Sequence, residues 1–485
     1  MVVGDVTTGT DVLVIGAGPG GYVAAIRAGQ LDLDVTLVER DAYGGACLNR
    51  GCIPSKALIT SSKLAHDAAN AEEMGIHANP AVDLSQMMNW KNDVVDGLTG
   101  GVEKLCKANG VNLVEGTAEF SGENSVRVVH AGEGQGSESI DFEHCIVATG
   151  SRPIQIPGFE FDGENVISSK TALELESVPT ELVVVGAGYI GMELACVYAQ
   201  LGTDVTVVEM LDDVLPPYED DVSRIVRKHA TSLGIDFHFG YTAAGWERAG
   251  DGIVVTATPA AADGGETASA EEADALELSA DKVLVAVGRQ PVTDTMNLEA
   301  AGLETDENGF LPTDDRARTE KDHIFAVGDV AGEPMLAHKA SKEGQVAAEV
   351  IAGEPAALDY VSMPAAVFTT PEVGTVGLTQ AEAEAQGFDP VVGKFPFSAS
   401  GRAMTANETD GFVRIVADDE SGFVLGGQIV GPEASELVAE LALAIEMGAT
   451  LEDVASTVHT HPTLSEAVME AAENALGHAI HTLNR

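Results

Sequence analysis

Two cysteines in one short stretch carry the most distinctive chemistry of this 485-residue sequence. Cys47 and Cys52 stand in the glycine-rich run 44–56, which is expected to form a short loop, and Lys56 supplies a cation close by. The loop can close a disulfide, but so small a ring constrains little of the unfolded chain and adds little stability. A neighbouring cation lowers the pKa of a thiol, and the thiolate is the reactive form. The pair is therefore expected to be reactive rather than structural.

Three other uses of the two cysteines are less favoured. A zinc site needs two more ligands at recognisable spacing, and no second Cys-x-x-Cys or His-x-x-x-His pair is present, so no metal is expected. Two buried, unreactive thiols would not need a glycine-rich loop. A structural disulfide goes with export, yet residues 1–11 contain no basic region followed by an apolar core, so a reducing cytoplasm is expected.

The run 44–56 resembles the redox-active segment of the flavin disulfide reductases, which are pyridine nucleotide-disulfide oxidoreductases. Its Ile-Pro-Ser-Lys ending is most similar to the members that oxidise a protein-bound dihydrolipoyl group with NAD+. The resemblance covers essentially the whole chain and implies bound FAD and NAD. It implies an α/β fold with two Rossmann-like dinucleotide-binding domains and an α+β interface domain that forms a homodimer. The lipoyl group would come on another chain, a subunit of a 2-oxoacid dehydrogenase or glycine cleavage system.

The elements that position the cysteines begin with a dinucleotide-binding pattern. An apolar run over 12–15 is typical of a buried parallel strand, and a glycine-rich turn and a helix over 22–30 follow it. Glu39 ends the next strand, 23 positions after the first glycine, and can accept from a ribose hydroxyl. A tight turn without a ligand is the alternative, but the acid at this distance disfavours it. The glycines that would approach a pyrophosphate are Gly16, Gly18 and Gly21.

The same pattern recurs 170 residues later, so one chain carries two dinucleotide-binding units. A strand over 182–185 leads into the second turn, and Glu209 again stands 23 positions after its first glycine. A 2′-phosphate would need an arginine here, and the next one is Arg224, so the sequence favours NAD over NADP. The turn consists of Gly186, Gly188, Tyr189, Ile190 and Gly191.

Further cofactor contacts are implied by the family resemblance. Asp329 would contact the ribityl-phosphate part of FAD, and residues 335–337 would lie near its ring system. Lys56 would stabilise negative charge near the flavin, with Glu193 as its partner near the nicotinamide. A helix-capping Asp329 and a plain surface ion pair are the alternatives. The other cofactor contacts expected are Arg40, Gly45, Gly116, Ala118, Thr149, Gly150, Gly288, Arg289 and Ala337.

A histidine and a glutamate before the last predicted helix form the candidate base. Thr463 and Glu466 fit a capping box, in which the glutamate only caps the backbone. In the family that this segment resembles, the histidine of His-Pro-Thr is the acid/base and the glutamate orients it, which places those roles on His461 and Glu466. A carboxylate on one imidazole nitrogen leaves the other free to take a thiol proton. The resemblance implies that this histidine meets Cys47 and Cys52 of the other subunit.

Four residues that attract attention receive no role from the sequence. They are His459, Cys106, Cys145 and Cys196. No cysteine follows Cys196, which disfavours the mercuric and large thioredoxin reductases, since these need C-terminal cysteines. Glutathione-type reductases favour NADPH, and soluble transhydrogenases of this fold lack the cysteine pair. A flavin-binding subunit with only an assembly role is the alternative from a different class of protein.

Composition limits the partners and the setting. The net charge is −51, from 77 acidic residues against 26 Lys plus Arg, which repels nucleic acid and anionic membranes at ordinary salt. Such charge often marks disorder, but α/β patterns run throughout the chain. A folded protein from a very salty cytoplasm is expected, because at ~1 M salt the Debye length is about 3 Å. No apolar run is long enough to span a bilayer.

The length suggests about three domains. An acidic segment over 257–281 is predicted to be an exposed hairpin extension of the NAD domain. The domains expected are a first FAD part over 1–155, an NAD-binding domain over 156–284, a second FAD-binding part over 285–355 and an interface domain over 356–485.

Overall fold

The first glycine-rich turn follows a strand of a mostly parallel sheet. The computed structural model describes residues 6–130, 136–260 and 275–484. Five strands run parallel in the order β3-β2-β1-β5-β16, and β4 pairs antiparallel with β3 and β5. Residues 12–15 of β1 enter two different cores alternately, so this part of the strand is apolar on both faces. The strands are β1 (Val6–Ile15), β2 (Val35–Glu39), β3 (Asn112–Gly122), β4 (Ser125–His130), β5 (Ser137–Val147) and β16 (Ile324–Ala326).

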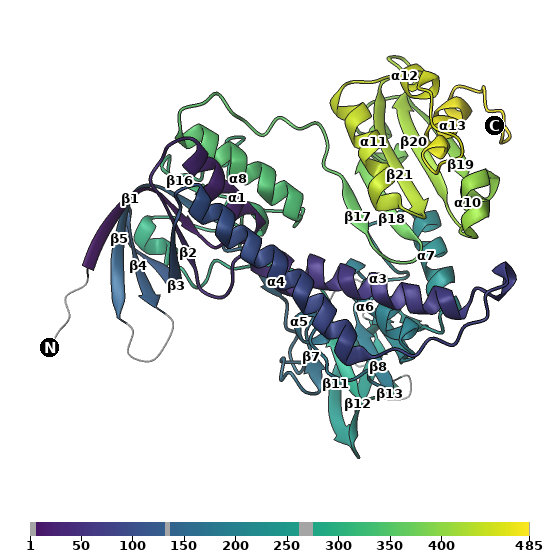
Figure 1. Cartoon of the computed structure of the whole chain (residues 1–485), viewed down its shortest axis with the longest axis horizontal. Coiled ribbons are helices and arrows are strands. Elements are labelled where there is room, and N and C mark those ends of the chain that lie inside the picture. The colour runs from purple at the N-terminus through teal and green to yellow at the C-terminus, as the bar shows by residue number, and fades with distance from the viewer. Residues whose placement is uncertain (1–5, 131–135, 261–274, 485) are drawn as a thin grey trace.

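Helices connect this sheet to the second dinucleotide-binding region. Figure 1 shows α3 and α4 as long helices that lie against each other and extend toward that region. The sequence predicts mostly helix over 63–109, and the structure agrees, although helix already begins at Cys52 and residues 75–83 are not helical. Asp83 caps α4 by accepting from the backbone N–H of Gln86. The helices are α1 (Pro19–Gln30), α2 (Gly45–Arg50), α3 (Cys52–Ala69), α4 (Leu84–Ala108) and α8 (Ala337–Ile351).

The second glycine-rich turn follows a strand of a fully parallel sheet, in the order β10-β9-β8-β14-β7. The predicted hairpin over 257–281 is present at its two ends, in β12 and β13, and 261–274 lie outside the described residues. β6 and β15 pair where the chain leaves the first region and returns to it. The strands are β7 (Val166–Ile167), β8 (Glu181–Val185), β9 (Asp204–Glu209), β10 (Asp236–Phe239) and β14 (Lys282–Val285) in this sheet, β11 (Tyr241–Ala249), β12 (Gly252–Pro259) and β13 (Leu276–Ala280) in a second, and the pair β6 (Ser151–Pro153) and β15 (Arg289–Pro291). The helices are α5 (Ser169–Ala172), α6 (Tyr189–Gln200) and α7 (Asp220–Ser232).

The rest of the chain, which we call the interface domain, folds around an antiparallel sheet in the order β17-β18-β21-β20-β19. Glycines and prolines interrupt the alternation in β18 and β19, and β17 has three residues, so these strands carry a weaker sequence signal than β20 and β21. The elements are β17 (Ala365–Val367), β18 (Glu372–Gly377), α9 (Gln380–Ala385), β19 (Pro390–Pro396), α10 (Gly401–Ala406), β20 (Phe412–Asp418), β21 (Val424–Gly431), α11 (Ala434–Glu446), α12 (Leu451–Ser456) and α13 (Glu466–Ala475).

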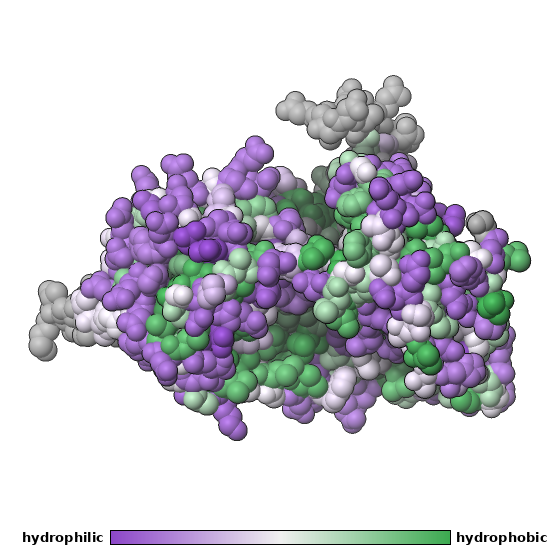
Figure 2. All heavy atoms as spheres, turned by 90° about the horizontal axis from the view of Figure 1, so that it is seen from above, coloured by the Kyte–Doolittle hydropathy of each residue, from purple (hydrophilic) through white to green (hydrophobic). Residues whose placement is uncertain are grey.

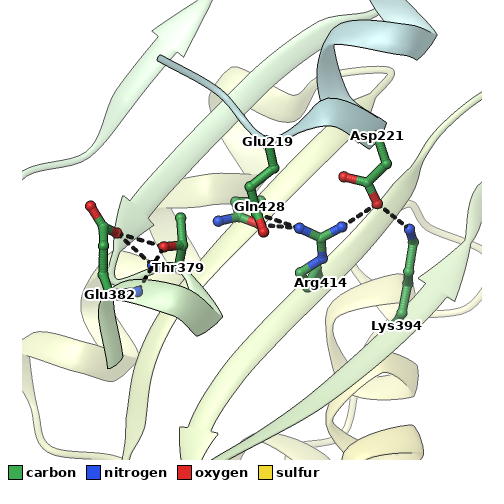
Figure 3. Close-up of polar contacts among 7 residues, drawn as sticks. All are labelled: Glu219, Asp221, Thr379, Glu382, Lys394, Arg414 and Gln428. Carbon is green, nitrogen blue, oxygen red and sulfur yellow. Dashed lines mark hydrogen bonds and ion pairs between the residues drawn. The ribbon is translucent and has the colours of Figure 1, made fainter. Parts of the chain in front are cut away.

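A buried arginine joins the second dinucleotide-binding region to the interface domain (Figure 3). Arg414 on β20 binds the carboxylates of Glu219 and Asp221 at the start of α7. Lys394 on β19 lies 2.7 Å from the same Asp221 oxygen that Arg414 binds. The helix α7 follows β9, the strand that ends at Glu209. This network therefore holds the segment after Glu209 against the interface sheet.

The surface reflects the acidic composition. Figure 2 shows hydrophilic residues over most of one face and a recessed area of hydrophobic residues between its two ends. Within the described ranges, no helix is both long and apolar enough to span a bilayer.

Candidate active site

The two cysteines lie on helices, and the expectation of a loop was wrong. Cys47 is in α2, and Cys52 is the first residue of α3, with Gly51 between the two helices. Gly45 is the reason that α2 sits where it does: its φ is +58°, and a Cβ there would lie 2.5 Å from the Cα of Gly18. The start of the cysteine segment therefore packs directly on the first glycine-rich turn.

Both cysteines are free thiols in the structure, and they interact with each other. The hydrogen bond from Cys47 and, against the effect of burial, the nearby ammonium of Lys56 lower the pKa of Cys52 to about 7. The same hydrogen bond, together with burial, raises the pKa of Cys47. Because Cys52 is exposed and Cys47 is half-buried, the pair is not a set of inert core thiols. Cys52 is the member that carries the negative charge.

The other three cysteines are of the inert kind. Cys106, Cys145 and Cys196 are all buried, and burial raises the pKa of each thiol. No chemistry is therefore assigned to them.

A cavity of about 470 Å³ runs from the first glycine-rich turn to the cysteines. It brings together most of the residues predicted to hold the first cofactor, including some that are far apart in the sequence. The predicted residues that line it are Gly16, Gly18, Glu39, Arg40, Gly45, Cys47, Cys52, Lys56, Gly116, Ala118, Thr149, Gly150, Tyr189, Ile190, Glu193, Arg289, Asp329 and Ala337. The remaining predicted residues do not line it: Gly21, Gly186, Gly188, Gly191, Glu209, Gly288, His461 and Glu466.

The first turn has the geometry that a pyrophosphate needs. Gly16 has φ +101°, and a Cβ there would lie 2.4 Å from the carbonyl of Ala148. Nothing lies within 4 Å of a Cβ built on Gly18, so the backbone is open to a ligand at that point. A Cβ on Gly21 would meet the carbonyl of Gly16 at 1.8 Å, so this glycine serves helix packing. The residues present fit FAD: they leave room at the amino end of α1, where backbone N–H groups attract phosphate.

The second turn repeats these features one by one. Gly186 has φ +102°, Gly188 is open, and a Cβ on Gly191 would lie 2.1 Å from the carbonyl of Gly186. Glu209 accepts from the backbone N–H of Ala187 at 2.6 Å. Glu39 does the same from Ala17 in the first turn, at 2.7 Å. Each acid is thus held at the edge of its turn, where a ribose would lie, and the second turn fits a second dinucleotide.

The two nucleotide sites meet at the start of α6. Tyr189 and Glu193, which follow the second turn, line the cavity that starts at the first turn. Burial raises the pKa of Tyr189 to about 12, so the phenol stays neutral. Groups bound in the two turns would therefore approach each other at this helix.

Asp329 is part of a hydrogen-bonded chain that the sequence did not reveal. The hydroxyl of Ser151 donates to the carboxylate of Asp329, and Arg289 donates to the same hydroxyl at 2.8 Å. Asp329 lies in a short 3-10 turn, and Glu343 accepts from the N–H of Gly328 just before it, at 2.7 Å. Ser151 was missed because a serine in a strand carries no sequence signal of its own.

Lys56 and Glu193 form the predicted ion pair, with 2.8 Å between Nζ and Oε2. The side chain of Glu193 is only 4% exposed, so the alternative of a plain surface pair is wrong. A buried carboxylate is costly unless it has partners, and Glu193 has two, the ammonium of Lys56 and the backbone N–H of Phe368.

His461 and Glu466 are brought together as predicted. His461 Nδ1 lies 2.8 Å from Glu466 Oε1, and the other oxygen accepts from the N–H of Thr463. Only half of the predicted capping box exists, since Ser465 is the residue before α13 and the Thr463 hydroxyl donates to a carbonyl instead. The imidazole is 80% exposed, and Figure 1 shows α13, which follows it, in a different part of the molecule from α3, which begins at Cys52.

His459 is a structural residue. Its side chain is 6% exposed, and its ring nitrogens face Glu440 Oε1 at 2.6 Å and the carbonyl of Thr457 at 2.8 Å. It ties the segment before His461 to α11.

No metal site accompanies these groups in the described part of the chain, where no three His, Cys, Asp or Glu side chains form a cluster that could hold an ion.

The chain matches two family models. Residues 10–344 match the pyridine nucleotide-disulphide oxidoreductase model, and residues 363–472 match the dimerisation domain of that family. The chain is also similar to solved structures over nearly its whole length. LpdA from Mycobacterium tuberculosis superposes with a TM-score of 0.87 at 28% identity, covering 96% of this chain and 99% of its own. The flavoprotein disulfide reductase RclA from Escherichia coli superposes with a TM-score of 0.83 at 25% identity, with the same coverage.

Curated relatives are more similar in sequence. The dihydrolipoyl dehydrogenases of Haloferax volcanii and Halobacterium salinarum are 71% and 69% identical, over 100% of both chains. That of Geobacillus stearothermophilus is 48% identical, also over 100% of both. The acidic, salt-adapted composition of this chain agrees with the halophilic source of the first two relatives. With its two dinucleotide turns, its cysteine pair and its interface domain, the chain belongs to the pyridine nucleotide-disulphide oxidoreductase family, whose enzymes use FAD and NAD(H).

Proposed function

We propose that this enzyme oxidises a protein-bound dihydrolipoyl group to the cyclic disulfide and reduces NAD+ to NADH, as dihydrolipoyl dehydrogenases do. The observation that carries the proposal is the cysteine pair, in which Cys52 has the lowered pKa and lies beside the buried Lys56–Glu193 ion pair. The full-length similarity to the curated dihydrolipoyl dehydrogenases supports the choice of substrate.

The thiol chemistry proceeds by exchange. His461, with Glu466 on Nδ1, takes a proton from one substrate thiol through Nε2. The resulting thiolate attacks Cys47 of the oxidised pair, the disulfide breaks, and Cys52 leaves as a thiolate. The second substrate thiol then displaces Cys47 from the mixed disulfide, its proton passes to the leaving Cys47 sulfur, and the cyclic disulfide is released. The substrate has lost two electrons and two protons, and the cysteine pair has gained the electrons.

The reduced pair must pass its electrons on. The residues that line the cavity would hold FAD, which would supply an acceptor for this electron pair and a hydride donor for NAD+. Both cysteines line the cavity, and Lys56 holds positive charge beside Cys52. Glu209 would accept from the 2′-hydroxyl of NAD and repel a 2′-phosphate.

The complete site is formed by two subunits in this proposal. His461 is exposed on the interface domain, away from its own cysteines, and that domain matches the family's dimerisation model. In a homodimer the histidine of one subunit would serve the cysteines of the other. A single copy would then have cysteines without a base.

The lipoyl group is proposed to arrive on a separate carrier subunit of a 2-oxoacid dehydrogenase or glycine cleavage system, in the cytoplasm. The domain division predicted from the sequence also stays a proposal. The strand order supports this division. The first sheet takes β1 to β5 from before the second dinucleotide-binding region in the sequence, and β16 from after it.

Other disulfide reductases of the family, and a flavin-binding subunit with only an assembly role, are the competing possibilities. A turnover assay in molar salt distinguishes them by comparing dihydrolipoamide with NAD+, and glutathione disulfide or Hg(II) with NADH and NADPH. We expect activity with dihydrolipoamide and NAD+. Higher activity with another thiol substrate would refute the proposal, and no thiol activity at all would favour the assembly role.

A further inference from the structure

One aromatic residue of the interface domain contacts both members of the Lys56–Glu193 ion pair. Phe368 follows β17 directly and is 175 positions away from Glu193 in the sequence. Its backbone N–H donates to Glu193 Oε1 at 2.9 Å, while the other carboxylate oxygen binds Lys56. The ammonium of Lys56 lies over the Phe368 ring, 4.4 Å from its centroid. A single residue therefore holds the carboxylate with its backbone and the cation with its side chain.

We propose that Phe368 is a positioning residue that keeps the Lys56 ammonium beside Cys52. A lysine side chain has four rotatable bonds and is mobile unless something fixes its end. Glu193 alone pulls the ammonium toward α6. The ring face of Phe368 offers a second attraction to the cation, and such contacts are strongest where water is partly excluded, as at this half-buried ring. The two contacts together restrict the ammonium to one place.

The charges around Cys52 show what depends on that place. Cys47 donates a hydrogen bond to the Cys52 sulfur, and the positive charge of Lys56 also favours the thiolate. Glu193 acts in the opposite direction, and Tyr189, which faces the same sulfur, stays neutral. The balance is favourable only while the ammonium is nearer to the thiolate than the carboxylate is. If the ring were lost, the ammonium would follow Glu193, and the pKa of Cys52 would rise.

The test is a double-mutant cycle read at the thiol. The inference rests on the proposed function, since it assumes that Cys52 is the working thiolate, but alkylation of Cys52 measures its titration without any turnover. In FAD-bound protein carrying Cys47→Ser, the rate of Cys52 alkylation by iodoacetamide is followed against pH by mass spectrometry in ~2 M KCl. Phe368→Leu should raise the midpoint by about half a unit, roughly a threefold loss of thiolate at neutral pH. Phe368→Tyr, which keeps the ring, should leave it unchanged.

Two further variants separate positioning from a general loss of structure. With Lys56→Met already present, Phe368→Leu should have no further effect, because the cation that the ring holds is gone. Phe412→Leu removes another ring that has a lysine over it, with Lys394 Nζ 3.6 Å from the ring centroid, and should not move the midpoint because Lys56 is not the lysine that this ring holds. An unchanged midpoint in Phe368→Leu overturns the inference. So does an equal shift with and without Lys56. The expected shifts in the Cys47→Ser protein, together with no lipoamide turnover by the native enzyme, would instead refute the proposed function alone.

Discussion

Glu466 binds His461 with one carboxylate oxygen and the backbone of Thr463 with the other, each at 2.8 Å. Although burial opposes it, the Thr463 N–H and the His461 ring hold the pKa of Glu466 below its ordinary value. The carboxylate is therefore ionised and fixed in direction before a substrate arrives. Nδ1 of His461 must then carry a hydrogen, which leaves Nε2 as the acceptor of a thiol proton.

Loss of this pair should reduce thiol oxidation more than it affects the flavin. His461→Gln should lower kcat/KM for dihydrolipoamide by about 100-fold or more, because proton removal is no longer assisted. Glu466→Gln should cause a smaller loss, since the ring remains but is less well oriented. Stopped-flow reduction of the flavin by dihydrolipoamide measures the effect. His481→Gln is the matched control, as it breaks a similar bond to Glu470 on the same helix, and full activity in His461→Gln would contradict the assigned base.

The two cysteines should respond differently to replacement by serine. Cys47→Ser or Cys52→Ser should abolish lipoamide turnover while FAD stays bound, because the first turn is intact in both. Only the variant that retains Cys52 should show a long-wavelength absorbance band, since that thiol has its pKa lowered to about 7 while the pKa of Cys47 is raised. The band should fade as pH falls below that value. Normal turnover in either variant, or a band that requires Cys47, would contradict the assignment.

Cofactor choice should depend on the acid at the end of β9. The native enzyme should prefer NAD to NADP by a wide margin, since Glu209 is fixed by the Ala187 N–H beside the ribose position. Glu209→Arg should narrow or reverse the preference by adding a phosphate partner. Steady-state kinetics with both nucleotides give the ratio. Equal use of the two by the native enzyme would show that the acid is not the selecting residue.

The buried arginine between the domains should matter far more than an exposed ion pair across the same boundary. Arg414→Met leaves Glu219 without a cation and Asp221 with Lys394 alone, and should lower the free energy of unfolding by roughly 3 kcal/mol. Lys228→Met breaks an exposed pair with Asp410 and should change it by less than about 0.5 kcal/mol. Denaturant titration in molar salt measures both. An equal loss of unfolding free energy in the two variants would mean that the burial of Arg414 adds nothing to stability.

The same network should make stability depend on acid. Although burial opposes it, Lys394 and Arg414 hold the pKa of Asp221 below its ordinary value of 3.8. A carboxyl whose pKa is lowered in the folded state stabilises that state above its ordinary pKa, and this is lost as pH falls through the folded value. The native protein should therefore lose stability below about pH 4, and Arg414→Met should lose less over that range. A parallel fall in both proteins would exclude Asp221 as the cause.

Salt should control activity through the dimer. At a net charge of −51, the subunits repel over ~30 Å in 0.01 M salt but over about 3 Å at 1 M. Desalting should separate the subunits, and with them His461 from the partner cysteines, before the first domain unfolds. Sedimentation and turnover on the same samples, from ~2 M to ~0.05 M KCl, test this. A fully active dimer at the lowest salt would refute the salt-adapted interpretation.

Several features of the site could be predicted because their signals are local. Backbone geometry requires glycine at Gly16, through its positive φ, and at Gly21, through its contact with Gly16, while Gly18 leaves the backbone open to a ligand. All three lie within six residues, so their spacing is visible in the chain. Glu39 and Glu209, which end β2 and β9, each stand at the same distance after the first glycine of their turn. The distance is set because the rest of the turn, one helix and one strand lie between that glycine and the acid. The cysteine pair and the His461–Glu466 pair were assigned by resemblance, and the structure brings the second pair together.

Helix boundaries near the cysteines could not be predicted in the same way. Gly44 and Gly45 suggested a loop, since both favour positive φ, and both indeed have it. The chain nevertheless enters α2 at once, because Gly45 packs against Gly18 and that contact exists only in the folded molecule. Tertiary packing decided the local conformation here.

By itself the sequence determined the family, the two nucleotide turns and the redox pair, all of which depend on spacing within short segments. Only the tertiary structure decided which distant polar and charged groups contact each other. The examples are Ser151 with Asp329, Arg414 with Asp221, and Phe368 with the Lys56–Glu193 pair. A hydrogen bond or ion pair between residues more than a hundred positions apart leaves no periodic pattern in either segment. It forms because buried polar groups must find partners among whatever the packed domains place beside them.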